Sequence, residues 1–112
     1  IRYSDVLLMA AEANNRKASA DDAKAQNYLN QVRARAFGNS SQATSSTGAT
    51  LTQEIWDERR LELAMEGHRF FDLVRTGEAA TKVSGFISGK HEVFPIPQSE
   101  IDISGLTQNS GY

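Results

Sequence analysis

The chain has 112 residues, of which 39% are hydrophobic, and this length and composition suit one domain with a modest core. Twelve basic and fourteen acidic residues give a formal net charge of −2 without a basic cluster, so the chain lacks the electrostatic footprint of a nucleic-acid-binding protein. The absence of cysteine excludes disulfides, thiolate metal sites and thiol nucleophiles, and no apolar run approaches the roughly 18 residues of a membrane-spanning helix.

The first predicted helix covers about residues 4–17. Apolar residues recur there at spacings of three and four, which places them on one face of a helix. Ser4 or Asp5 is positioned to cap its start. The chain begins at Ile1 rather than Met and runs straight into this pattern, so we expect it to be a piece of a longer polypeptide.

A second helix is predicted to follow a short connection. Asp21 and Asp22 favour its start, because carboxylates are stabilising at the positive end of a helix. It should close near Phe37, with Gly38 as its C-cap. Two helices of similar length joined by a short turn predict an antiparallel hairpin, which is loosely similar to one tetratricopeptide unit.

The middle of the chain is predicted to be a loop followed by a third helix. Residues 39–50 are rich in Ser and Thr and have no large apolar side chain, so we expect a solvated, mobile loop. The third helix should start after Thr50 or Thr52 and continue through Met65. Gly67 is expected to end or kink it.

The remaining residues predict shorter elements. A fourth helix of about two to three turns should run from His68 to Gly77, with a further short helix after it. Pro95 and Pro97 favour an extended stretch, after which residues 98–101 can form a single turn. The expected fold class is therefore all-α: a tetratricopeptide-like hairpin, two further helices and an irregular Pro-containing C-terminal tail, with the chain forming a single domain.

The segment ERRLELAMEGHRFFDLVRTG, residues 58–77, combines dense charge with large apolar side chains. Burying its apolar side forces neighbouring charges to find partners. Arg59 with Glu62, or Arg69 with Asp72, are expected to form partly buried pairs. Arginines of the second helix, Arg33 and Arg35, are either partners of third-helix carboxylates or solvated. The predicted structural ion-pair network comprises Glu58, Arg59, Glu62, Glu66, Arg69 and Asp72.

The same segment offers weak candidates for a metal site and for catalysis. His68, Asp72 and Glu66 lie close in sequence, but they lack the ligand spacing of a stable metal site, and His91 lies in a separate loop. Three glutamates at spacings of four could line one face for acid–base chemistry, but arginines three residues away explain them as ion pairs. We therefore expect no catalytic residue, no metal site and no cofactor.

Aromatic residues are the remaining candidates for ligand contact, since sugar rings can stack on them. Tyr3 and Tyr28 fall at helix-packing spacings and are more simply core residues. Trp56, Phe86 and Tyr112 are left as candidates for exposed contact. Composition alone does not favour carbohydrate binding.

Four segments, in order, resemble the C-terminal part of the SusD/RagB family of glycan-binding outer-membrane lipoproteins. They are IRYSDVLLMAAEAN at Ile1–Asn14, LNQVRARAFG at Leu29–Gly38, the charged segment at Glu58–Gly77, and FPIPQSEI with LTQNSGY at Phe94–Tyr112. The resemblance covers nearly the whole chain. Phe70 and Thr76 stand where tryptophan is common in the family, and Ser110 stands where proline is frequent.

The resemblance implies a largely helical fold with tetratricopeptide-like units, a surface-exposed outer-membrane location and a TonB-dependent transporter as partner. Family members capture oligosaccharides or, in some cases, peptides, through residues mainly upstream of these motifs, so the ligand-binding residues of this chain are unknown. Membrane association is expected only through an N-terminal lipid anchor outside this chain, and self-association is expected as a way for the chain alone to hide exposed surface. The alternative is a free-standing helical adaptor that binds peptides through its hairpin.

Overall fold

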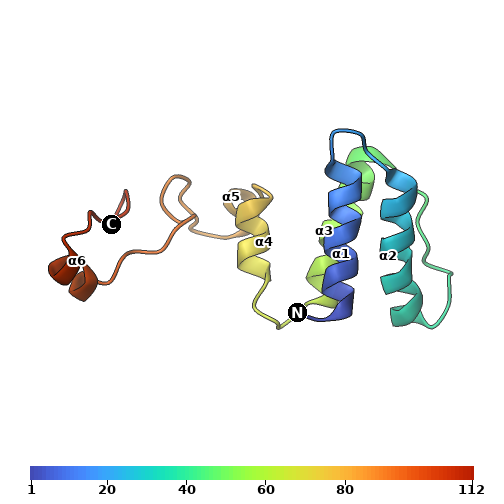
Figure 1. Cartoon of the computed structure of the whole chain (residues 1–112), viewed down its shortest axis with the longest axis horizontal. Coiled ribbons are helices and arrows are strands. Elements are labelled where there is room, and N and C mark those ends of the chain that lie inside the picture. Colours follow the sequence, from blue (N-terminus) through green and yellow to red (C-terminus); the bar gives the residue numbers. More distant parts are fainter. The chain divides into compact units, whose positions relative to one another are not determined.

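The computed structural model describes all 112 residues, and every regular element in it is a helix (Figure 1). This confirms the expected all-α class. The chain forms two compact units, Ile1–Arg69 and Phe70–Tyr112. None of the helices is both long enough and apolar enough to cross a membrane.

Helices α1 (Tyr3–Arg16) and α2 (Asp22–Phe37) form the predicted hairpin. Its ends are set by local chemistry: the Asp21 side chain accepts a hydrogen bond from the Lys24 amide (3.0 Å), and Gly38 adopts the left-handed conformation (φ 72°) that suits a C-cap. The prediction that Ser4 or Asp5 caps α1 is wrong. The N-cap residue is Arg2, and its side chain makes no capping hydrogen bond. Asp5 does not cap the helix because its side chain is buried in the interior of the unit.

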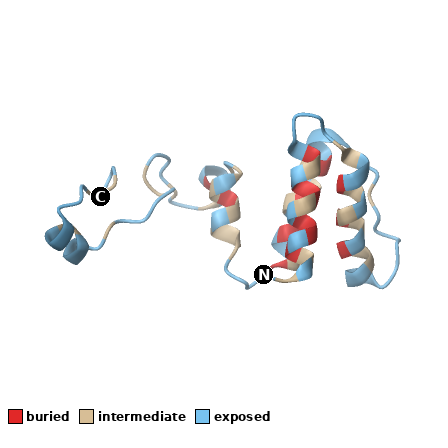
Figure 2. Ribbon diagram, viewed as in Figure 1, coloured by how far each residue is buried: buried red, intermediate tan, exposed pale blue.

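Helix α3 (Gly48–Glu62) packs against both α1 and α2. In the first unit most buried residues lie on these three helices (Figure 2), and the hydrophobic ones among them form one cluster. The fully buried large ones are Leu8, Leu29, Leu51, Ile55 and Val32. Each removes most of its surface from water, which contributes about 1.5–3 kcal/mol per side chain. Packing of this small core sets the positions of the three helices and so of the side chains that they carry.

Helix α3 begins earlier and ends earlier than its sequence predicts. At its start, the Asp22 carboxylate accepts a hydrogen bond from the Gly48 amide (2.8 Å), while Asn15 Nδ2 donates to the Gly48 carbonyl (3.1 Å). Residues at the end of α1 and at the start of α2 thus hydrogen-bond the first turn of α3. At its other end, Arg2 donates to the Glu62 carbonyl, which stops the helix five residues before Gly67.

The loop between α2 and α3 is exposed, as expected, but it is not loosely held. Side-chain amides of α2 hydrogen-bond its main chain at Thr44 and Ser46. We call residues 42–46 the strap. The expectation of a mobile loop did not include these hydrogen bonds. They are made to the main chain of the loop, so the pattern of apolar residues does not indicate them.

In the second unit, α4 (Arg69–Arg75) and α5 (Ala79–Lys82) precede a long irregular segment and α6 (Gln98–Ser104). Helix α6 is longer than the single turn expected. The extended stretch before it is held by Gln108, whose side-chain amide bonds both the N–H (2.8 Å) and the C=O (2.9 Å) of Ile96. Side-chain amides that hydrogen-bond the main chain therefore hold the irregular tail, as they hold the strap.

Candidate functional site

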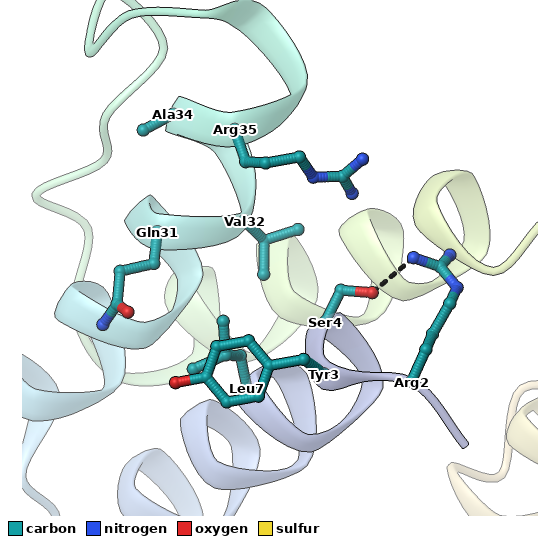
Figure 3. A pocket seen from close by; sticks show the side chains of 8 residues that line it. All are labelled: Arg2, Tyr3, Ser4, Leu7, Gln31, Val32, Ala34 and Arg35. Atoms are coloured by element: carbon teal, nitrogen blue, oxygen red, sulfur yellow. Dashed lines mark hydrogen bonds between the residues drawn. The ribbon is translucent and has the colours of Figure 1, made fainter.

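An apolar groove lies between the first turn of α1 and the last turns of α2 (Figure 3). Its volume is about 500 Å³. Leu7 and Val32 are buried beside it, and Tyr3, which is 72% exposed, lies across its edge. The residues that line it are Arg2, Tyr3, Ser4, Leu7, Gln31, Val32, Ala34 and Arg35.

Two arginines that line this groove, Arg2 and Arg35, belong to a charge cluster. The Glu62 carboxylate is bound by Arg2 from the start of α1 and by Arg35 from the end of α2. Arg2 Nε also donates to Glu66 Oε1 (2.8 Å). Two arginines thus meet two glutamates, and the guanidinium groups nearest the groove are engaged by protein carboxylates.

These contacts change the acidity of the groups. Burial raises the pKa of Glu62, but hydrogen bonds from Arg2 and Ser4 and the positive charges of Arg35 and Arg2 outweigh it, so the pKa lies below its usual 4.5. The hydrogen bond to Glu62 correspondingly raises the pKa of Arg2. A carboxylate held ionised in this way is a poor proton acceptor near neutral pH.

A second pair connects α3 with α1 inside the unit. Arg59 Nη1 donates to Asp5 Oδ1 (2.8 Å), and both residues are buried, with 6% and 4% of their surfaces exposed. Two unlike charges buried together stabilise each other, while either one alone would be strongly unfavourable. Asp5 occupies the same face of α1 as Leu8, so its charge requires the arginine of α3.

A third group of pairs joins α2 to α3. Arg33 Nε donates to Glu58 Oε2 (2.8 Å), and Arg33 Nη1 donates to Glu54 Oε2 (3.1 Å). Ser46 of the strap donates to the other Glu54 oxygen (2.5 Å). Burial raises the pKa of Glu54, but hydrogen bonds from Ser46 and Thr44 and the charge of Arg33 leave it below its usual value. The strap is therefore part of this ion-pair group.

Of the two alternatives for Arg33 and Arg35, the structure shows pairing with α3 carboxylates. The short-range pairs expected within the 58–77 segment differ from those found. Arg59 meets Asp5 from another helix, and Asp72 accepts from Arg75 Nε (2.8 Å) within α4. For Arg59, the partner across the helix interface prevails because packing holds it in place, whereas Asp72 pairs with an arginine three residues away in its own helix.

Sequence reasoning missed Arg2 and Asp5. A usable signal existed for Asp5: it lies three residues before Leu8 and seven before Glu12, on the face of α1 that carries the core. A carboxylate at a core position predicts a buried cation elsewhere. Nothing in the sequence around Arg2 indicates its role, because that role depends on where α3 ends.

Among the aromatic candidates, Trp56 and Phe86 make ring contacts and are partly buried, whereas Tyr112 is 44% exposed. The Arg16 guanidinium lies over the Trp56 ring, 5.5 Å from its centroid. Phe86 packs against Phe70, with their centroids 6.4 Å apart, and the Tyr112 hydroxyl donates to the Val93 carbonyl (3.0 Å). Tyr28 packs against the core as expected. The prediction that Tyr3 belongs to the core is wrong, because its side chain is 72% exposed at the edge of the groove between α1 and α2.

The arrangement does not assemble a catalytic or metal-binding constellation. The structure holds no group of three or more His, Asp or Glu side chains placed to bind one metal ion. His91 Nδ1 accepts a hydrogen bond from the Ile87 amide (3.0 Å), in the loop that precedes it. Glu58, Glu62 and Glu66 are each bound by an arginine. What the arrangement does chemically is hold three helices together.

Comparisons with known proteins agree with these features. The model of the SusD family matches residues 1–93. SusD-like protein P25 of Formosa agariphila is 33% identical over 128 residues, which cover 99% of this chain and 24% of the relative. SusD-like protein P2 of the same organism is 32% identical, covering 100% of the chain and 25% of the relative. SusD-like protein P38 is 38% identical over 93 residues, or 79% of the chain.

The chain spans about a quarter of the length of the first two relatives. The family model covers the first three of the four recognised motifs and stops at residue 93, before FPIPQSEI, whereas the match to P2 extends over the whole chain. The all-helical fold and the matched residues together establish the family that the motifs indicated. The chain belongs to the SusD family.

Proposed function

We propose that this chain is the C-terminal part of a surface-exposed outer-membrane lipoprotein that binds oligosaccharides or polysaccharides and passes them, chemically unchanged, to a TonB-dependent transporter. Membership of the SusD family supports this role for the whole protein. The lipid anchor and the glycan-binding residues would belong to parts of the polypeptide outside these 112 residues. Within that protein the chain forms one domain and serves as scaffold.

One observation carries the scaffold role. The carboxylates of α3 that face its neighbouring helices are bound by arginines from α1 and α2. A glycan site needs polar groups free to hydrogen-bond a sugar, and these groups are already bonded to one another. We extend this role to the whole predicted set, Glu58, Arg59, Glu62, Glu66, Arg69 and Asp72, as a structural network.

Calorimetric titration tests both levels of the proposal. The isolated chain is expected to give no heat of binding with a panel of oligosaccharides, whereas the longer SusD-family protein that contains it is expected to bind at least one of them. Micromolar binding by the isolated chain would refute the scaffold role. Failure of the longer protein to bind any glycan, with capture of peptides instead, would favour the adaptor alternative.

The proposed partnership needs a separate experiment. The longer protein, purified from its native outer membranes in mild detergent, is expected to bring down a TonB-dependent transporter that mass spectrometry identifies. A matched purification from cells that lack the protein controls for non-specific capture. Recovery of the protein without any transporter would argue against the partnership.

A further inference from the structure

One face of α2 holds an extended piece of polypeptide by its main chain. Gln26 Nε2 donates to the Ser46 carbonyl (2.8 Å), Asn30 Nδ2 to the Thr44 carbonyl (3.0 Å), and Arg33 Nη1 to the Gln42 carbonyl (3.3 Å). The three donors are spaced four and three residues apart along one helix face, and they meet every second carbonyl of the strap. The helical repeat thus matches the two-residue repeat of an extended chain.

Asn30 hydrogen-bonds both the N–H and the C=O of one residue, Thr44. Its Oδ1 accepts from the Thr44 amide (2.8 Å), while its Nδ2 donates to the Thr44 carbonyl. A side-chain amide that bonds both main-chain groups of one residue takes the place of a neighbouring strand, which is how main-chain recognition works when a peptide is added to a sheet edge. Such recognition does not depend on the identity of the residue that is read.

The strap itself contributes little beyond these bonds. Its residues are Gln42, Ala43, Thr44, Ser45 and Ser46, and none has a large apolar side chain that could anchor it. Only Thr44 and Ser46 are partly covered. Its side-chain contacts with another helix are the hydrogen bonds from Ser46 and Thr44 to the Glu54 carboxylate of α3. Its place on α2 is therefore secured by main-chain hydrogen bonds and by its covalent tether, which supplies a high effective concentration.

We propose that the Gln26, Asn30 and Arg33 face of α2 is a docking site for an extended peptide segment, and that the strap occupies this site in cis and can be displaced. The partner is a polypeptide in extended conformation, and α2 hydrogen-bonds its alternate carbonyls and one of its amides. Small polar side chains suit it, because the occupant observed carries them. The proposal is independent of the glycan-binding role, and neither fails with the other.

The test uses a fluorescent peptide with the strap sequence SSQATSST and the variant Thr44→Pro of the whole chain. Proline keeps the extended backbone but lacks the N–H that donates to Asn30 Oδ1, so the strap binds α2 more weakly. The peptide is expected to bind this variant about tenfold more tightly than wild type, since loss of one hydrogen bond costs on the order of a factor of ten. Fluorescence anisotropy measures both affinities.

Two further substitutions, each made in the Thr44→Pro background, show where the peptide binds. Asn30→Ala is expected to weaken binding at least about tenfold, since it removes both hydrogen bonds to the peptide. Asn27→Ala is the matched control: Asn27 lies on the same helix and bonds Gln31 rather than the strap, so binding should be unchanged. Equal affinity in all variants, or no saturable binding, would overturn the proposal.

A measurement on wild type guards against misfolding of the variants. Hydrogen exchange of the Thr44 amide, followed by NMR, is expected to quicken when unlabelled strap peptide is added in excess, because the peptide displaces the strap. A peptide with proline at the position of Thr44 should have a weaker effect. An exchange rate that the peptide leaves unchanged would overturn the proposal.

Discussion

At the scale of single residues, the chain meets the conflict between charge and burial by pairing side chains across helix interfaces. Asp5 and Arg59 are the sharpest case, because both are buried and each depends on the other. Removing the arginine leaves a carboxylate without compensation in the interior. These two residues are therefore more sensitive to substitution than the exposed charges around them.

Arg59→Ala is expected to lower the free energy of unfolding by about 3–5 kcal/mol, because Asp5 remains buried without its partner. The adjacent Arg60→Ala is the control: Arg60 is exposed, and a surface substitution should change stability by less than about 0.5 kcal/mol. Urea denaturation gives both values. Equal midpoints for the two variants would show that the pair contributes no stability.

The acidity of Glu62 predicts how stability depends on pH. Because its pKa is lower in the folded chain than its usual 4.5, ionised Glu62 stabilises the fold fully above that pH. This stability is lost as the pH falls through the lower, folded pKa. The free energy of unfolding should therefore decline below about pH 4.5, and Glu62→Gln should show a shallower decline. Parallel slopes for variant and wild type would contradict this account.

At the scale of elements, sequence reasoning succeeded where information is local. The hairpin was predictable because Asp21 and Gly38 mark helix ends and apolar spacing marks the buried faces. The start of α3 was not, because Gly48 joins the helix through contacts with Asp22, which is remote in sequence. The strap was also missed, because main-chain bonds to Asn30 leave no periodicity to detect.

The same limit applies to the candidate site. The charged segment was recognisable as a place of ion pairing, but most of its partners were not. Arg2 and Asp5 are more than fifty residues from the side chains that they bind. Such contacts follow from the way three helices pack, and a single sequence does not specify that geometry. For Arg33 and Arg35, on the preceding helix, the sequence left pairing and solvation open.

Packing of the three helices predicts the effect of a core truncation. Leu29 of α2 is fully buried in the core that α1 and α3 share. Leu29→Ala should therefore cost about 2–5 kcal/mol of unfolding free energy, from lost burial and the cavity left behind. Leu61→Ala, at a position 64% exposed, should cost far less. Thermal denaturation followed by circular dichroism checks both; similar melting temperatures would contradict the packing described.

At the scale of the whole molecule, much apolar surface is left uncovered. In the first unit the exposed large side chains include Ile1, Tyr3, Phe37, Leu61 and Met65. Surfaces of this kind usually meet another polypeptide. A chain that spans a quarter of its relatives is expected to lack some of the neighbours that would cover them.

The isolated chain should therefore self-associate. Sedimentation velocity is expected to show a sedimentation coefficient that rises with protein concentration, because apolar side chains of separate copies bury one another. Tyr3→Ser combined with Met65→Ser should reduce this rise, since both side chains are largely exposed. A sedimentation coefficient that stays constant at all concentrations would show that these side chains do not drive association.

We propose that the charged segment of this SusD-family chain holds the fold together and does not contact the glycan. Calorimetric titration of the longer protein carrying Glu62→Gln, with an oligosaccharide that the wild type binds, tests it most directly. We expect an affinity within about twofold of wild type together with a lower melting temperature. An affinity about tenfold weaker at an unchanged melting temperature would contradict it and place Glu62 at the ligand.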